Sequence, residues 1–196
     1  MPELKNRHKW IDSNTKQNQN RHAVSLTFQI LFLFSTFHTF PLFLLFFLQY
    51  DDCAVDMDED AGPVNRMSRW TLNPDLKSVD PSSEIVFFET SRLGTQTHNS
   101  GDIEFGADGK VYVTVGESGS KKHKNDNGEY YPLARNVLLG SVVRFNDDGT
   151  IPNDNPFTSQ SGWKKSGRCG LNGGMHRDAD TACSEIYATG FRNPFR

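Results

Sequence analysis

Short segments rich in β-branched and aromatic residues, separated by turns containing glycine and aspartate, follow one another along the chain after residue 50. In that part of the chain no segment carries apolar residues at helical spacing over three turns. The pattern predicts strands at 84–90, 102–105, 110–115, 141–145 and 185–189. Many short strands joined by tight turns are typical of a sandwich, a barrel or a propeller. We therefore expect an all-β fold.

Two of the turns have a specific signature. Asp108-Gly109 lies between two alternating runs, which is the strongest short-range signal for a β-hairpin. Asp147-Asp148-Gly149 follows the segment 141–145 and repeats the arrangement. Both sequences predict that a strand ends in a tight turn at these positions.

The N-terminal part of the chain has a different pattern. Residues 1–22 are polar and basic, residues 23–50 form an almost uncharged run rich in phenylalanine, and residues 51–61 are an acidic linker. The apolar run exceeds the roughly 20 residues that a membrane-spanning helix needs. Its basic flank favours a cytoplasmic N-terminus, with the remainder of the chain extracellular or lumenal. We expect a signal anchor, a transmembrane helix or a signal peptide, and hence a membrane-anchored or secreted protein.

Two other interpretations of the apolar run stay open. Gln29, His38 and Pro41 lie within it and would be costly in the middle of a membrane span. The run also has the low complexity of translated non-coding sequence. Alternatively it is a buried strand, in which case residues 46–50 form a strand of the β domain with unrelated sequence upstream.

Composition and charge exclude several classes of protein. With 196 residues and a net charge of −3, the chain has no general electrostatic reason to bind nucleic acid. Sixteen glycines and nine prolines argue against a helical bundle. Three cysteines are too few for a disulfide-dense miniprotein, and their odd number leaves one unpaired within the chain.

Three stretches contain sequence motifs in addition to the strand pattern: Thr97–Glu117, Leu138–Phe157 and Glu185–Arg196. In this order and at these separations they resemble the glucose/sorbosone dehydrogenase family. That family comprises the soluble quinoprotein sugar dehydrogenases and their hedgehog-interacting-protein-like relatives. The resemblance covers residues 62–196.

The resemblance implies a six-bladed β-propeller with four-stranded antiparallel blades. Residues 62–196 would supply about two such blades and parts of others, too few strands to close a ring. We therefore expect a partial propeller, the N-terminal fragment of a longer protein or of a truncated gene product.

The resemblance also implies a chemistry: quinone-dependent oxidation of an aldose sugar, with pyrroloquinoline quinone (PQQ) and calcium as cofactors. His98 would act as general base, taking the proton of a sugar hydroxyl while hydride passes to the quinone. An imidazole suits this task because it titrates near neutral pH. Glu117 stands where the family usually has aspartate and would orient His98, although its extra methylene moves the carboxylate.

The resemblance extends to residues that would hold the quinone, namely Arg192, Asn193 and Asn99. A guanidinium fork suits the carboxylates and carbonyl oxygens of the cofactor. No metal ligand is predicted within the chain, and the calcium ligands are expected beyond Arg196. A non-catalytic extracellular propeller that binds a protein ligand, or an inactive truncated product, are the alternatives.

Cys169 and Cys183 flank a glycine-rich loop. A disulfide between them would stabilise the fold by about 3 kcal/mol through loop closure. It would also agree with export to an oxidising compartment. Cys53 would then be left over.

Overall fold

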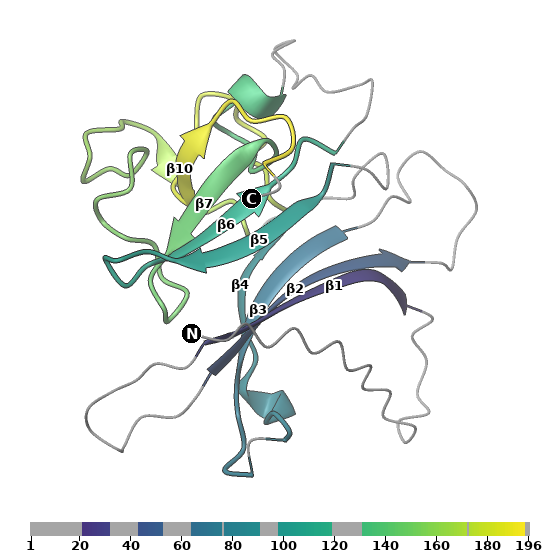
Figure 1. Cartoon of the computed structure of the whole chain (residues 1–196). Helices are drawn as coiled ribbons and strands as arrows, with labels where there is room; N and C mark the ends of the chain where they lie inside the picture. Colours follow the sequence, from purple (N-terminus) through teal and green to yellow (C-terminus); the bar gives the residue numbers. More distant parts are fainter. Residues whose placement is uncertain are drawn as a thin grey trace.

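Two antiparallel sheets of four strands each make up most of the structure, a computed structural model that describes residues 21–31, 43–52, 64–75, 77–90, 98–118, 131–171 and 173–194 (Figure 1). The first sheet contains, in spatial order, β1 (Arg21–Leu31), β2 (Phe43–Asp52), β3 (Val64–Thr71) and β4 (Ile85–Glu89). The second contains, in spatial order, β10 (Ile186–Thr189), β7 (Ser141–Phe145), β6 (Val111–Val115) and β5 (Ser100–Phe105). The all-β prediction is confirmed for the described residues.

Shorter elements lie between strands of the same sheet. Two 3-10 helices, η1 (Pro81–Ser83) and η2 (Tyr131–Leu133), precede β4 and β7. A two-stranded parallel pair, β8 (Ser166–Gly167) and β9 (Ala182–Cys183), lies in the segment between β7 and β10. Residues 1–20, Cys53 and most of the acidic linker predicted for 51–61 lie outside the described residues.

The hairpin predicted around Asp108-Gly109 joins β5 to β6. The amide of Gly106 donates to the carbonyl of Lys110, 2.9 Å away, and the amide of Gly109 donates to the carbonyl of Gly106. Gly109 has φ +73°, a conformation that costs glycine nothing because it lacks a Cβ. Along β6, Val111, Val113 and Val115 are buried while the residues between them are half-buried, as the alternating pattern predicts.

The second predicted turn forms, but it does not lead into a hairpin. The amide of Asn146 donates to the carbonyl of Thr150, 2.9 Å away, and Gly149 has φ +81°. After this turn the chain leaves the sheet at Ile151, and no paired strand follows until β8. The partner of β7 on the side away from β6 is instead β10, which comes some forty residues later in the chain.

The apolar run forms strands where a membrane-spanning helix was expected over residues 23–50. Strand β2 pairs with β1 on one side and with β3 on the other, in register from Phe43↔Thr71 to Tyr50↔Val64. This pairing gives the backbone of a phenylalanine-rich segment partners in neighbouring strands, and aromatic residues favour such a surface. None of the helices among the described residues has the length and apolarity to cross a membrane. The alternative strand at residues 46–50 is confirmed, because it lies within β2.

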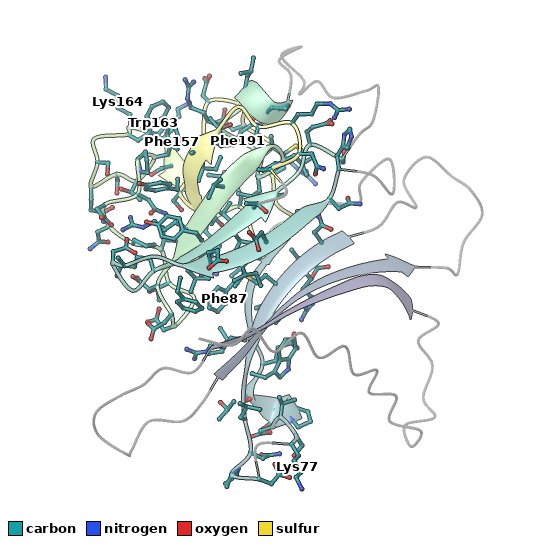
Figure 2. The ribbon with its side chains drawn as sticks, viewed as in Figure 1. Lys77, Phe87, Phe157, Trp163, Lys164 and Phe191 are labelled. Carbon is teal, nitrogen blue, oxygen red and sulfur yellow. A yellow bond between two sulfur atoms is a disulfide. The ribbon has the colours of Figure 1, made fainter. Side chains whose placement is uncertain are left out.

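The core lies where the edge strand β4 meets the second sheet. Phe87 and Phe88 of β4 are fully buried, and their rings lie 5.4 and 6.0 Å from the ring of Phe145 on β7 (Figure 2 labels Phe87). The buried valines of β6 belong to the same cluster. This packing sets the C-terminal end of β4 and the start of β3 beside the segment that enters β5.

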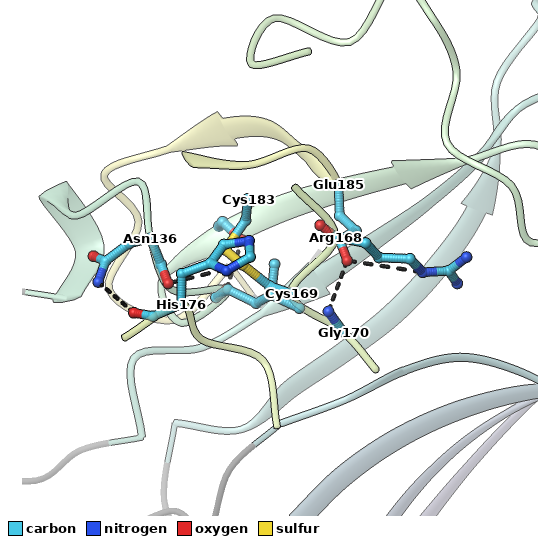
Figure 3. The surroundings of a disulfide bond; sticks show 9 residues. Asn136, Arg168, Cys169, Gly170, His176, Cys183 and Glu185 are labelled. Carbon is cyan, nitrogen blue, oxygen red and sulfur yellow. Dashed lines mark hydrogen bonds and ion pairs between the residues drawn. A yellow bond between two sulfur atoms is a disulfide. The ribbon is translucent and has the colours of Figure 1, made fainter. Parts of the chain in front are cut away.

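The predicted disulfide between Cys169 and Cys183 is present, with 5.3 Å between the two Cα atoms (Figure 3). The loop that it closes and the residue just before it cover the outer edge of β4: the amide of Glu89 donates to the carbonyl of Gly170, and Arg168 Nη2 donates to the carbonyl of Phe87 at 2.7 Å. An uncovered edge strand is a template for aggregation. The disulfide therefore stabilises a loop that protects this edge.

Glu185 supports the same loop from inside. Its side chain is fully buried, and Oε1 accepts a hydrogen bond of 2.7 Å from the amide of Gly170 (Figure 3). Burial, which disfavours the charged form, raises the pKa of this carboxyl.

Candidate functional site

His98 lies two residues before the start of β5 and has φ +57°, in the left-handed region that non-glycine residues rarely adopt. Its carbonyl oxygen accepts a hydrogen bond of 3.1 Å from the amide of Ser118, which follows β6 and itself has φ +72°. The two left-handed residues thus hold each other where β5 begins and β6 ends. Such conformations persist only where the surroundings impose them, and they cluster at functional sites.

Gly116 makes this close approach possible. A Cβ at this position would lie 1.8 Å from the carbonyl oxygen of His98 and 2.8 Å from Oδ1 of Asn193. No side chain fits there, so glycine is required by contact rather than by its own backbone angle. The same measurement places the carbonyl oxygen of His98 and Oδ1 of Asn193 beside the same point next to Gly116.

Glu117 binds the ring of His98. Its Oε1 forms a hydrogen bond with Nδ1 of His98, and the glutamate side chain is only 8% exposed against 21% for the histidine. With the carboxylate accepting from Nδ1–H, the lone pair of the neutral ring is on Nε2. The pair predicted from the sequence is therefore in contact, and it fixes the tautomer that a general base needs.

Arg192 and Asn193 lie beside this pair. The amide of Glu117 donates to the carbonyl oxygen of Arg192 at 2.9 Å, and Oδ1 of Asn193 lies near Gly116. The arginine residue is exposed and Asn193 is half-buried. The structure thus brings together four residues from two motifs that lie more than seventy positions apart in the sequence.

Asn99 is half-buried next to His98, and its carbonyl oxygen accepts from Nδ2 of Asn65 at 3.3 Å. Its side-chain oxygen Oδ1 is buried and has no hydrogen-bond partner among the described residues. An amide oxygen accepts hydrogen bonds from N–H and hydroxyl donors. Asn99 can therefore accept a hydrogen bond from a bound molecule.

Three residues that shape the site were not predicted from the sequence: Gly116, Ser118 and Asn65. A glycine directly after an apolar strand signals close backbone approach, so Gly116 could have been found. Ser118 and Asn65 carry no local signal, because their roles depend on contacts with residues far away along the chain.

Two other polar features do not include His98. A surface depression is lined by Arg66, Val86, Glu89, Gly170, Leu171 and Gly173. Arg66 is held there by Glu84 at 2.8 Å and Glu89 at 3.0 Å, so its charge is balanced within the protein.

The second feature surrounds Arg144, at the opposite end of β5 and β6 from His98. Its guanidinium is almost fully buried and donates to Asp108 at 2.7 Å and to Asp154 at 2.9 Å. The hydrogen bond from Arg144 is the largest influence that lowers the pKa of Asp108, to about 2. This network joins the β5–β6 turn to the segment after β7 and is structural. Across the described ranges, no group of three or more histidine, cysteine, aspartate or glutamate side chains could hold a metal ion.

Comparisons with known proteins agree with the motifs. The sequence model of the family described as Glucose / Sorbosone dehydrogenase matches residues 42–167, from the start of β2 to β8. The chain is 29% identical over 123 residues to the aldose sugar dehydrogenase YliI of Escherichia coli (strain K12), a match that covers 63% of this chain and 26% of that protein. It is 28% identical over 137 residues to quinoprotein glucose dehydrogenase B of Acinetobacter calcoaceticus, covering 64% of this chain and 24% of the relative.

A solved structure of a glucose dehydrogenase is similar to 76% of this chain and 37% of its own, with a TM-score of 0.49 and 19% identity. The chain spans about a quarter of the length of the curated relatives that it matches. Because the family match covers well over half of its residues, the chain belongs to the glucose/sorbosone dehydrogenase family.

Proposed function

We propose that this chain contributes the general base and part of the cofactor-binding surface of a PQQ-dependent sugar dehydrogenase. The observation that carries the proposal is the contact of His98 with Glu117, directly beside Arg192 and Asn193. Membership of the family, and the names of relatives that act on glucose and aldose sugars, support the class of substrate.

His98 takes the proton of a sugar hydroxyl on Nε2. Removing hydride from a carbon that bears a hydroxyl leaves a positive centre unless the hydroxyl proton departs as well, so a positioned base lowers the barrier. The carboxylate of Glu117 accepts from Nδ1–H, which orients the ring and stabilises the imidazolium that forms. The partial exposure of the ring leaves it accessible to a substrate.

The residues beside His98 fit the quinone cofactor by their chemistry. The Arg192 side chain is exposed and offers N–H donors to carboxylates and carbonyl oxygens. Asn193 and Asn99 add amide groups, and the unpartnered Oδ1 of Asn99 accepts from an N–H or a hydroxyl. When bound, PQQ supplies the capacity to take up the hydride and its two electrons. Calcium, which the family resemblance implies, is assigned to none of the described residues.

We also propose that the two four-stranded sheets are blades of a β-propeller, whose blades are antiparallel sheets of four strands. The disulfide supports a location in an oxidising compartment, since such bonds persist there. A secreted or membrane-anchored protein with this part outside the cytoplasm agrees with it.

The experiment is reconstitution of the full-length gene product with PQQ and Ca²⁺. It should retain the quinone and reduce an artificial dye when an aldose sugar is added. Retention of no quinone, together with no dye reduction for a panel of aldoses, would contradict the proposal. It would favour a propeller that binds a protein ligand, or an inactive product.

A further inference from the structure

Asn65 is a fully buried polar residue at the start of β3 that the chemistry above does not use. Its backbone is fixed by one residue of the neighbouring strand end. The amide of Asn65 donates to Oγ1 of Thr90 at 3.0 Å, and its carbonyl accepts from the amide of Thr90 at 2.8 Å. The backbone of Asn65, from which the side chain extends, is therefore held within the first sheet.

The side chain of Asn65 crosses from the first sheet to the second. Its Nδ2 donates to the carbonyl oxygen of Asn99 at 3.3 Å. Asn99 follows His98, whose own carbonyl is held by the amide of Ser118. Two consecutive carbonyls are thus held by donors from different sheets.

Burial makes this arrangement costly for an asparagine. Oδ1 of Asn65 has no hydrogen-bond partner among the described residues, although the side chain is removed from water. An apolar side chain would avoid that penalty if the position only had to be filled. The favourable contribution of an asparagine here is its Nδ2–H donor toward Asn99.

We propose that Asn65 is a positioning residue for His98: its amide holds the Asn99–Ser100 peptide, the second peptide group after His98, and so supports the left-handed conformation at His98 that directs the imidazole to Glu117. The consequence for turnover rests on the proposed function, whereas the structural part stands without it. Loss of the Nδ2 donor releases the Asn99 carbonyl, and the left-handed conformation at His98 then loses one of its two supports.

The first test is amide hydrogen exchange, which reports local opening. The probe is the Ser118 amide, which donates to the carbonyl of His98, and the reference is the Arg144 amide, which donates to the carbonyl of Glu185. In Asn65→Ala we expect the Ser118 amide to exchange about tenfold faster relative to the Arg144 amide. Equal acceleration of both amides, or no change at Ser118, would overturn the proposal.

The matched control is Arg69→Met. Arg69 also joins the two sheets through a side-chain donor to a backbone carbonyl, Nη1 to Asp147 at 2.6 Å, but Asp147 lies in the turn after β7, at the opposite end of the second sheet from His98. Its replacement should leave the ratio of Ser118 to Arg144 exchange unchanged. If Asn65→Ala is too unstable to compare, exchange of the Asn65 side-chain amide is measured in the wild-type protein instead. A side-chain amide of Asn65 that exchanges as fast as a surface asparagine would contradict the proposal, and a protected one would support it.

A second readout separates this proposal from the proposed function. With quinone and sugar, Asn65→Ala should lower kcat by about tenfold with little change in KM, because orientation of the base is impaired rather than binding. Arg69→Met should keep the wild-type kcat. If the wild-type protein itself neither binds quinone nor oxidises sugars, the proposed function fails, and the exchange experiment still decides the role of Asn65.

Discussion

The main-chain amide of Glu117 and the carbonyl oxygen of Arg192 are joined by a hydrogen bond of 2.9 Å. The bond ties the segment after β6 to the segment after β10, two places that the strand order alone does not bring into contact. Because Glu117 also binds the ring of His98, the bond links a candidate base to a candidate cofactor-binding arginine. The position of His98 relative to Arg192 is therefore set by one backbone hydrogen bond and by the side chain of Glu117.

Replacement of Gly116 tests the crowding that this arrangement requires. In Gly116→Ala the new Cβ would lie 1.8 Å from a backbone oxygen, so the chain must move. We expect a loss of about 3 kcal/mol in the free energy of unfolding. In the control, Gly109→Ala, the Cβ meets nothing within 4 Å and only the positive φ is strained. That variant should lose about 1 kcal/mol. Equal losses in urea denaturation would show that contact with His98 is not decisive.

The charge of Glu117 should matter more than its length. In Glu117→Gln the amide can present a donor to Nδ1, which favours the wrong tautomer of His98, and kcat should fall by about 100-fold or more. Glu117→Asp keeps the carboxylate and should recover most of that loss, with KM unchanged in both variants. The measurement is steady-state dye reduction. A glutamine variant with the wild-type kcat would exclude this role for Glu117.

Much of the fold could be predicted from local sequence. The strands at 141–145 and 110–115 and the turn at Asp108-Gly109 were confirmed because alternation and turn chemistry act over a few residues. The apolar run could not be settled in this way. Its length matches a membrane span, and only its pairing with β1 and with β3 identifies β2 as a strand.

In the candidate site, too, some residues could be predicted from local motifs and others depend on long-range contacts. Motif resemblance placed His98, Glu117 and Arg192 in one site, and the contacts join them. Nothing in the residues around Asn65 indicated its hydrogen bond to Asn99, because that bond depends on how the two sheets pack.

The disulfide should contribute to stability through the loop of 14 positions that it closes. Cys169→Ser with Cys183→Ser, or reduction with dithiothreitol, should lower the free energy of unfolding by about 3 kcal/mol. The amide of Glu89 donates to the carbonyl of Gly170 in this loop. Without the disulfide, its hydrogen exchange should accelerate more than that of the Arg144 amide. Unchanged stability, with Glu89 still protected, would show that the loop holds the β4 edge without the bond.

Acid stability should depend on Asp108. Its pKa is lowered to about 2 by Arg144. A lowered pKa means that the unfolded chain binds the proton more readily. The stabilisation by Asp108 is therefore present above its ordinary pKa of 3.8 and is lost as the pH falls toward 2. In Asp108→Asn, the free energy of unfolding should therefore depend less on pH in this range. Identical curves for the variant and the wild-type protein, measured by urea denaturation between neutral pH and pH 2, would contradict the assignment.

The most direct test of the account is His98→Asn, since asparagine tolerates the left-handed backbone at this position but is not a base. The variant protein is reconstituted with PQQ and Ca²⁺, and both quinone retention and aldose-dependent dye reduction are measured beside the wild-type protein. The account predicts that quinone retention stays at the wild-type level while kcat falls by about 100-fold or more. A variant that retains the quinone and oxidises the sugar at the wild-type rate would contradict it.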